Sequence, residues 1–412
     1  MTDVHGTRDV KETQEGKESD AEILATYRAV LEVDGVDLAM RAALQEAHLT
    51  PTQALRKLVV ERGIPDEDPW AVVRDGQRAT TRGLVWKALL GVRTVAADEY
   101  IALVRAGPAS CAKKISCDVG RTFQSDKDFC SLVSSDSLTR LLNAFANDVD
   151  GLFIAFLLLF CSSFCSVVYH FVFFFLAFSH KNKHINININ ININTITTTT
   201  ARKLDREGYV QGLNVVAGMF LSCMPEPDAF ACFRRVVVDL VPRYFRGMLD
   251  GSADGCALAL AVLRLTDWEL HEHLTARLHL VPMLLNQSVL GLLANHPPLR
   301  EARRLWDLFV AFGFGLVPVA VAATLVAARR DWLARASLTR VKDAAPVHAR
   351  ALTQLTLALA ARLPPDLLRA LHRHPRVHVD ISEYAPSPTA TGHSVYAFQA
   401  SPPRRTSFPS PV

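Results

Sequence analysis

Two short segments of this sequence carry residues that could take part in catalysis. The first, residues 115–123, reads ISCDVGRTF and places Arg121 three residues after Asp118. The second, residues 209–214, reads YVQGLN and contains Gln211. GTP hydrolysis uses such a pair, because an arginine neutralises charge on the γ-phosphate and a glutamine orients the attacking water. We therefore predict that Arg121 and Gln211 act together in GTP hydrolysis.

Neighbouring residues in both segments are expected to support this pair. Asp118 would orient the Arg121 guanidinium through a charge-assisted contact, although it could instead cap a helix. We expect Gln211 to begin a helix and to share its exposed face with Asn214 and Gly218. We expect Tyr209 and Gly212 to shape the turn around the glutamine, and Asn214 to hydrogen-bond to nearby backbone. The complete supporting set within the two segments is Asp118, Thr122, Tyr209, Gly212 and Asn214.

Gln211 lies 90 positions after Arg121, and the sequence between them contains a segment of foreign character. Residues 152–178 are almost wholly apolar and rich in Phe, and residues 185–194 are a strict Ile-Asn repeat. We interpret residues 148–200 as translated non-coding sequence, such as a retained intron. Removing these 53 residues leaves a spacing of 90 − 53 = 37 residues. A membrane anchor and a disordered loop insertion are the alternatives.

The apolar run 152–178 is long enough to cross a bilayer, which takes about 20 residues. One crossing would place Arg121 and Gln211 on opposite sides of the membrane, where they could not share a substrate. Two crossings need about 40 residues and a turn, more than the run provides. We therefore do not expect a membrane partner.

Composition narrows the remaining function classes. The 412 residues carry a net charge of only +4, with no basic stripe, so we expect no nucleic-acid partner. The first residues resemble no signal peptide, and the eight cysteines form no Cys-x-x-Cys pair, which favours reduced thiols in the cytoplasm. His271 and His273, two residues apart on a helix, should lie apart on the surface, so we predict no metal.

Helical periodicity runs through the rest of the sequence. Ile23, Tyr27 and Val30 share one helix face, and Thr50-Pro51 marks a helix start that Gly63 should end. Similar stripes recur to about residue 374, without a convincing alternating strand pattern, so we predict an all-α fold. Residues 1–19 and 385–412 lack this periodicity and are expected to be disordered.

Three motifs in order resemble those of the TBC domain family, whose members accelerate GTP hydrolysis by Rab-like small GTPases. RGLVWK at residues 82–87 resembles the first motif, Arg-x-x-x-Trp-Lys. Residues 115–122 and 209–212 resemble the second and third, which in the family hold the catalytic arginine and glutamine. The family separates these two by a few tens of residues, which suits a spacing of 37. Ser116 departs from the proline common in the family, which could loosen the loop.

This resemblance implies an all-α TBC domain with two helical subdomains over residues 81–375, interrupted by 148–200, with N-terminal helices over 20–80. Arg82 and Trp86 would act mainly in packing and pairing, and Asp307 would be buried against a cation. The chain would complete the active site of a GTPase that itself binds Mg²⁺ and GTP, so it would need no cofactor. A non-catalytic TBC adaptor and a membrane-tethered TBC protein are the rival functions.

A narrower resemblance links the chain to TBC proteins of the mitotic-exit and septation networks. It rests on LLNAFA at residues 141–146, MPEPDAF at 224–230, LWD at 305–307 and AFG at 311–313. Those proteins form half of a two-component GTPase activator with a scaffold subunit. The resemblance implies a cell-cycle role, a scaffold partner, and recruitment from the cytoplasm to the spindle pole or centrosome.

Overall fold

Helices make up nearly all regular structure in the described part of the chain. The computed structural model describes residues 18–32, 38–67, 73–74, 77–149, 209–246, 249–277, 281–334, 341, 348–382 and 384. Within these ranges, the strands β1 (Val73–Arg74) and β2 (Gln77–Arg78) have two residues each and pair antiparallel. The predicted all-α fold is confirmed.

One of the three N-terminal helices begins at the capping residue, Thr50, that the sequence predicts. The three are α1 (Asp20–Leu31), α2 (Leu38–Glu46) and α3 (Pro51–Glu61). The Thr50 hydroxyl accepts a hydrogen bond from the Gln53 N–H, and the Gln53 side chain accepts one from the Thr50 N–H at 2.8 Å. This reciprocal pair satisfies two N–H groups that a helix start would leave free. Gly63, with φ +70°, lies in the left-handed region just past the end of α3, as predicted.

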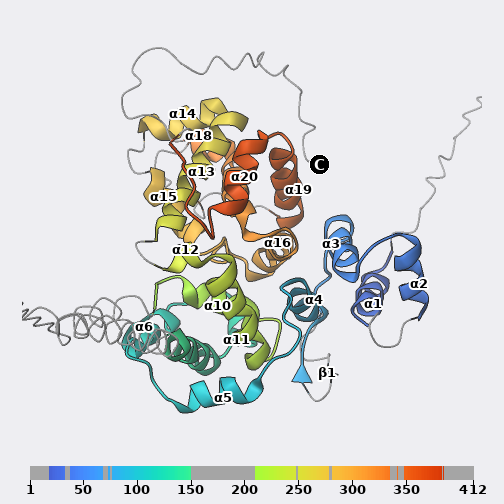
Figure 1. Ribbon diagram of the computed structural model, residues 1–412. Coiled ribbons are helices and arrows are strands. Elements are labelled where there is room, and N and C mark those ends of the chain that lie inside the picture. The colour runs from blue at the N-terminus through green and yellow to red at the C-terminus, as the bar shows by residue number, and fades with distance from the viewer. Residues whose placement is uncertain are drawn as a thin grey trace, which may run out of the picture.

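The other helices form two groups, seen in the lower and upper parts of Figure 1. The first comprises α4 (Thr81–Leu89), α5 (Ala97–Arg105), α6 (Ala112–Val119), α7 (Lys127–Leu132), a helix over 135–149, α10 (Leu213–Leu221) and α11 (Glu226–Arg234). The second comprises α12 (Pro242–Phe245), α13 (Asp250–Thr266), α14 (Trp268–Arg277), α15 (Val281–Leu290), α16 (Leu299–Phe312), α17 (Val317–Ala327), α18 (Arg329–Ala334), α19 (Ala349–Ala360) and α20 (Pro365–Arg373). A π-helix, η1 (Arg235–Leu240), follows α11, and a 3₁₀ turn, η2 (Phe314–Leu316), precedes α17.

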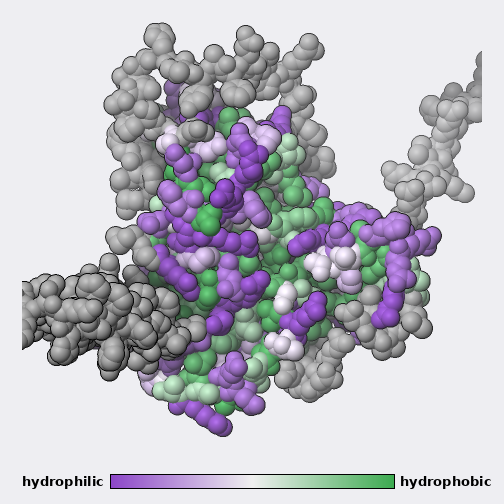
Figure 2. Space-filling model, viewed as in Figure 1, coloured by the Kyte–Doolittle hydropathy of each residue, from purple (hydrophilic) through white to green (hydrophobic). Residues whose placement is uncertain are grey.

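A single connected core joins the two groups through α16, which packs on α3, α4 and α7 as well as on α19. The rings of Trp86, Phe220 and Trp306 meet with centroids 5.6–5.9 Å apart, and all three are fully buried. They come from α4, α10 and α16. Hydrophilic side chains are spread widely over the face in Figure 2, with hydrophobic ones visible between them.

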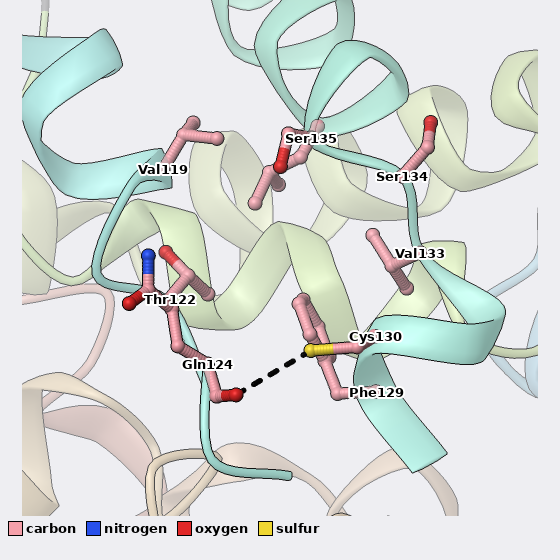
Figure 3. A pocket seen from close by; sticks show the side chains of 9 residues that line it. Val119, Thr122, Gln124, Phe129, Cys130, Val133, Ser134 and Ser135 are labelled. Atoms are coloured by element: carbon pink, nitrogen blue, oxygen red, sulfur yellow. Dashed lines mark hydrogen bonds between the residues drawn. The ribbon is translucent and has the colours of Figure 1, made fainter. Parts of the chain in front are cut away.

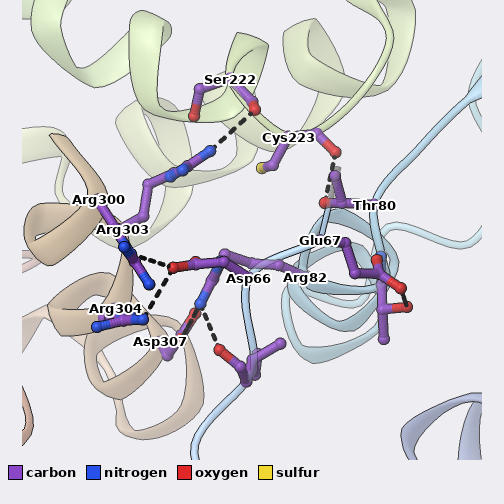
Figure 4. Close-up of polar contacts among 12 residues, drawn as sticks. Asp66, Glu67, Thr80, Arg82, Ser222, Cys223, Arg300, Arg303, Arg304 and Asp307 are labelled. Atoms are coloured by element: carbon purple, nitrogen blue, oxygen red, sulfur yellow. Dashed lines mark hydrogen bonds and ion pairs between the residues drawn. The ribbon is translucent and has the colours of Figure 1, made fainter. Parts of the chain in front are cut away.

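The guanidinium of Arg82 lies at the centre of a buried ionic cluster (Figure 4). It donates to both carboxylate oxygens of Asp307, to Asp66 at 2.6 Å and to the carbonyl of Ile64 at 2.5 Å. The indole of Trp86 also donates to Asp307, at 2.8 Å. Asp307 is thus buried against a cation, as predicted, and the cluster links α4 and α16 to residues 64–66.

A second buried polar contact fastens the C-terminal end of the described fold. The Nδ1 atom of His374 lies 2.8 Å from the carbonyl of Leu371, which can only accept, so Nδ1 carries the proton. Nε2 therefore accepts from the hydroxyl of Tyr244 at 2.8 Å. Burial lowers the pKa of His374 to about 4 from an ordinary 6.5. The imidazole is neutral at pH 7 and joins α12 to α20.

The predicted insertion, residues 148–200, lies outside the described residues except for its first two. One of these, Asp148, lies in the helix over 135–149 and accepts from Arg234 at 2.6 Å, so this residue is part of the fold. The apolar run 152–178 is not described, and among the helices that are, none is long and apolar enough to span a membrane.

The expectation that His271 lies on the surface is wrong. Its side chain is buried against the ring of Trp268, with ring centroids 5.7 Å apart. The two histidines do point in different directions, as their spacing requires. His271 lies on the side of α14 that faces the neighbouring helices.

Replacing Arg82 by methionine should destabilise the protein by about 3–5 kcal/mol, because it leaves Asp307 buried without its counter-charge. Adding Asp307→Asn should restore part of this loss, since the amide oxygen still accepts from Trp86. Urea denaturation measures both. Arg369→Ala is the matched control, because the Arg369–Asp366 pair is exposed and should be worth at most about 1 kcal/mol. A double variant whose loss is the sum of both single losses would contradict this account.

The protein should also lose stability between pH 7 and pH 5 through His374. In the unfolded chain the pKa of His374 is near 6.5, whereas burial in the folded chain lowers this pKa to about 4. The unfolded state therefore takes up more protons as pH falls, which costs roughly 2 kcal/mol at pH 5. Denaturation at both pH values should show a smaller pH dependence in His374→Gln. His372→Gln, at an exposed position of α20, should keep the wild-type dependence.

Candidate functional site

Arg121 is presented to solvent from the end of a short helix. α6 stops at Val119, and the Arg121 side chain is 59% exposed while one guanidinium nitrogen contacts the carboxylate of Asp118. The Asp118 side chain itself is only 5% exposed. The hydroxyl of Thr122 donates to the backbone carbonyl of Asp118 at 2.6 Å. A buried carboxylate and a local backbone contact therefore fix the base of an exposed cation.

Gln211 lies on the turn that leads into α10, two residues before the helix begins at Leu213. It is exposed, and Gly212 behind it adopts φ +112°, which L side chains rarely adopt. The Gly212 N–H donates to the Asn214 side-chain oxygen at 3.1 Å, so Asn214 does bond to nearby backbone as predicted.

Gln211 was also expected to begin this helix and to share an exposed face with Asn214 and Gly218. That expectation is wrong, because the left-handed Gly212 turns the chain before the helix starts. Asn214 and Gly218 are buried while Gln211 stays outside.

Two buried hydrogen bonds join the segments that hold Arg121 and Gln211. The hydroxyl of Tyr209 donates to Asp118 Oδ2 at 2.8 Å, and the amide of Asn214 donates to Thr122 Oγ1 at 2.8 Å. Burial raises the pKa of Tyr209, and the Asp118 carboxylate adds to this, so the phenol remains a donor at neutral pH. All the supporting residues predicted within the two segments thus meet in one place.

The two other predicted supporting residues, Arg82 and Trp86, belong to the buried ionic cluster on α4. Their polar atoms bond to residues 64–66 and to Asp307. This matches the packing and pairing expected for them.

Sequence reasoning missed the residues that hold the chain just after Arg121. Phe123 has φ +46°, in the left-handed region that bulky residues avoid. Its ring packs on Phe129 of α7, with centroids 4.9 Å apart. Asp126 caps α7 through the Phe129 N–H at 3.0 Å and also accepts from the Leu299 N–H at the start of α16. An Asp three residues before an aromatic residue was the only sequence signal for this cap.

A cavity of about 150 Å³ lies beside this segment (Figure 3). Apolar and hydroxyl side chains line it in similar numbers. The Cys130 thiol at its edge lies 3.7 Å from the backbone carbonyl of Gln124. The lining residues are Val119, Thr122, Gln124, Phe129, Cys130, Val133, Ser134, Ser135 and Leu138. The cavity therefore borders the backbone that carries Arg121.

Comparison with known proteins assigns the family. The sequence profile described as the Rab-GTPase-TBC domain matches residues 174–331, which include Gln211. A mitotic check point protein BUB2 of Dictyostelium discoideum is 30% identical over 339 residues, covering 81% of this chain and 77% of that protein. The chain belongs to the TBC domain family. The resemblance drawn from its three motifs is confirmed.

Two fungal relatives extend this TBC assignment. The cell division control protein 16 of Schizosaccharomyces pombe is 30% identical over 307 residues, covering 73% of this chain and 82% of its own length. The mitotic check point protein BUB2 of Saccharomyces cerevisiae is 26% identical over 325 residues, covering 78% and 90%. The narrower likeness drawn from the sequence is therefore confirmed to the extent that these relatives are named for mitotic check point and cell division control.

Two solved TBC structures also match. The Chlamydomonas flagellar RabGAP TBC domain has a TM-score of 0.47 and 17% identity, covering 83% of this chain and 96% of that structure. The Ypt/Rab-GAP domain of Gyp1p has a TM-score of 0.47 and 13% identity, covering 87% and 98%.

Replacing Tyr209 by phenylalanine should cost about 1.5–3 kcal/mol, because the buried Asp118 carboxylate loses a hydrogen bond. Tyr100→Phe is the control: Tyr100 also donates to a carboxylate, that of Glu226, but Arg140 binds the same group in a more exposed place. Denaturation should show the smaller loss for Tyr100→Phe. Equal losses would mean that the Tyr209 bond does not stabilise the site specially.

Proposed function

We propose that this TBC protein is a GTPase-activating protein that supplies Arg121 and Gln211 to a Rab-like small GTPase. The observation that supports this most directly is the pair of buried hydrogen bonds between the two segments. Tyr209–Asp118 and Asn214–Thr122 hold together residues that lie 90 positions apart, while both reactive side chains remain exposed. Side chains that must enter another protein's active site need this combination of a fixed base and a free tip.

In this proposal Arg121 neutralises the negative charge that develops on the γ-phosphate oxygens in the transition state. Its guanidinium already contacts the Asp118 carboxylate on one side, which limits its orientations and leaves other N–H donors for phosphate. Because the charge of Asp118 is buried, it orients the arginine without itself facing the anionic substrate.

Gln211 would position the water that attacks the γ-phosphate. Its side-chain oxygen can accept a hydrogen bond from this water, and its amide can donate to a phosphate oxygen. The turn at Gly212 keeps the side chain outside the helix that begins at Leu213. The partner GTPase binds the nucleotide and its Mg²⁺, so the TBC chain needs only to supply the two side chains.

The relatives suggest the setting in which such an activator would work. Two carry the name mitotic check point protein and one the name cell division control protein. We extend this to a cell-cycle role for the present chain, at mitotic exit or cytokinesis. A scaffold subunit that recruits it from the cytoplasm to the spindle pole or centrosome remains part of the proposal.

Arg121→Ala should lower the stimulated rate of GTP hydrolysis by roughly 10³- to 10⁵-fold, because the transition state loses its neutralising charge. Gln211→Ala should lower it by roughly 10²-fold or more, through loss of a positioned donor and acceptor. Single-turnover hydrolysis by candidate Rab-like GTPases, with purified TBC protein, measures both.

Arg93→Ala and Gln45→Ala, at exposed positions away from the two segments, are the matched controls and should keep full stimulation. Stimulation that survives both Arg121→Ala and Gln211→Ala would refute the two-residue mechanism. Wild-type protein that binds a GTPase tightly without stimulating it would favour the adaptor function instead.

A further inference from the structure

We propose that Phe129 is a positioning residue for Arg121, and that its contact with Gly218 sets where Arg121 stands relative to Gln211. The inference rests on the proposed function of these two side chains. It concerns α7 and the middle of α10, outside the two segments that carry the sequence motifs.

The backbone after Arg121 is held in a conformation that it would not adopt alone. Phe123 is a bulky residue at φ +46°, in a region that L side chains rarely adopt. Such a conformation persists only when neighbouring contacts impose it. The contacts on Phe123 include the ring of Phe129, the hydrogen bond from the Asp126 N–H to the Phe123 carbonyl at 2.8 Å, and the Cys130 thiol 3.8 Å from the same carbonyl.

The far side of the Phe129 ring rests directly on α10. A Cβ atom built on Gly218 would lie 2.7 Å from Phe129 Cε2, closer than real Cβ atoms approach, and 3.1 Å from Cζ, which is a tight contact. Gly218 therefore lets the ring lie against the helix backbone. α10 begins two residues after Gln211, and Phe123 lies two residues after Arg121. The Phe129 ring contacts both α10 and Phe123, so it links the helix that follows Gln211 to the segment that carries Arg121.

The position of Phe129 is also fixed by a contact outside both segments. Its N–H donates to Asp126, whose other carboxylate oxygen accepts from the Leu299 N–H at 2.7 Å. This ties α7 to the start of α16, in the second group of helices. A ring held in this way can transmit a displacement of α10 to Phe123, and through Phe123 to Arg121.

Gly218→Ala tests the contact with a single added methyl group. The methyl should push the Phe129 ring outward and move Arg121 with it. We expect kcat of stimulated GTP hydrolysis to fall by roughly 10²-fold, as expected for a misplacement of about 1 Å, with little change in KM for the GTPase. Adding Phe129→Leu to Gly218→Ala should make room for the methyl and recover most of the lost kcat.

Gly255→Ala is the matched control. Gly255 also lies inside a long helix, α13, and its added Cβ would lie 2.8 Å from both Val289 Cγ1 and the Tyr244 hydroxyl. This variant should lose stability while kcat of the stimulated reaction stays at the wild-type value. Equal falls in kcat for both variants would mean that general loosening is responsible, and would overturn the inference.

Hydrogen–deuterium exchange of the full chain gives a readout that needs no GTPase. Gly218→Ala should speed exchange in peptides covering residues 120–129, the double variant should restore it, and Gly255→Ala should leave it unchanged. Unchanged exchange in Gly218→Ala would refute the positioning role even if Arg121 proves essential. Conversely, suppose that exchange is faster in Gly218→Ala but Arg121→Ala stimulates GTP hydrolysis as well as the wild type does. The coupling between Gly218 and residues 120–129 would then stand, and the proposed function would be rejected.

Discussion

The buried charge of Arg82 is the constraint on which the assembly of the two helix groups depends. A guanidinium that is 4% exposed must find carboxylates and carbonyls, because an unpaired ion in the interior costs several kcal/mol. The guanidinium is paired with Asp307 of α16, and with Asp66 and the carbonyl of Ile64 in the chain before β1. The α4–α16 packing is therefore specified by charge as well as by the apolar contact of Trp86 with Trp306.

The same principle operates on a smaller scale at the candidate site. The Asp118 carboxylate is buried, and it is satisfied by Tyr209 from the later segment and by Arg121 from its own. Satisfying one buried acid thus brings together two segments that are distant in the sequence. The side chains of Arg121 and Gln211 stay exposed beside this buried contact.

The predictions that were wrong share a cause. Periodicity placed Gln211 on one helix face with Asn214 and Gly218, but a left-handed glycine between them breaks the period. His271 was placed on the surface because its spacing from His273 excludes a shared face. The spacing of two residues on a helix shows whether their side chains point in different directions. Which of these directions faces the core depends on where the neighbouring helices lie.

The sequence by itself determined the all-α class and several helix boundaries, and it singled out Arg121 and Gln211 as the candidate pair. These depend on local causes: apolar periodicity, the Thr50 and Gly63 end signals, and three ordered motifs. Only the tertiary structure decided that Asp118 meets Tyr209, that Thr122 meets Asn214, and that Phe129 lies against Gly218. Such contacts join residues about 90 positions apart, and they arise from packing of buried surfaces and satisfaction of buried polar groups. No local sequence pattern specifies which helix surfaces will pack against each other.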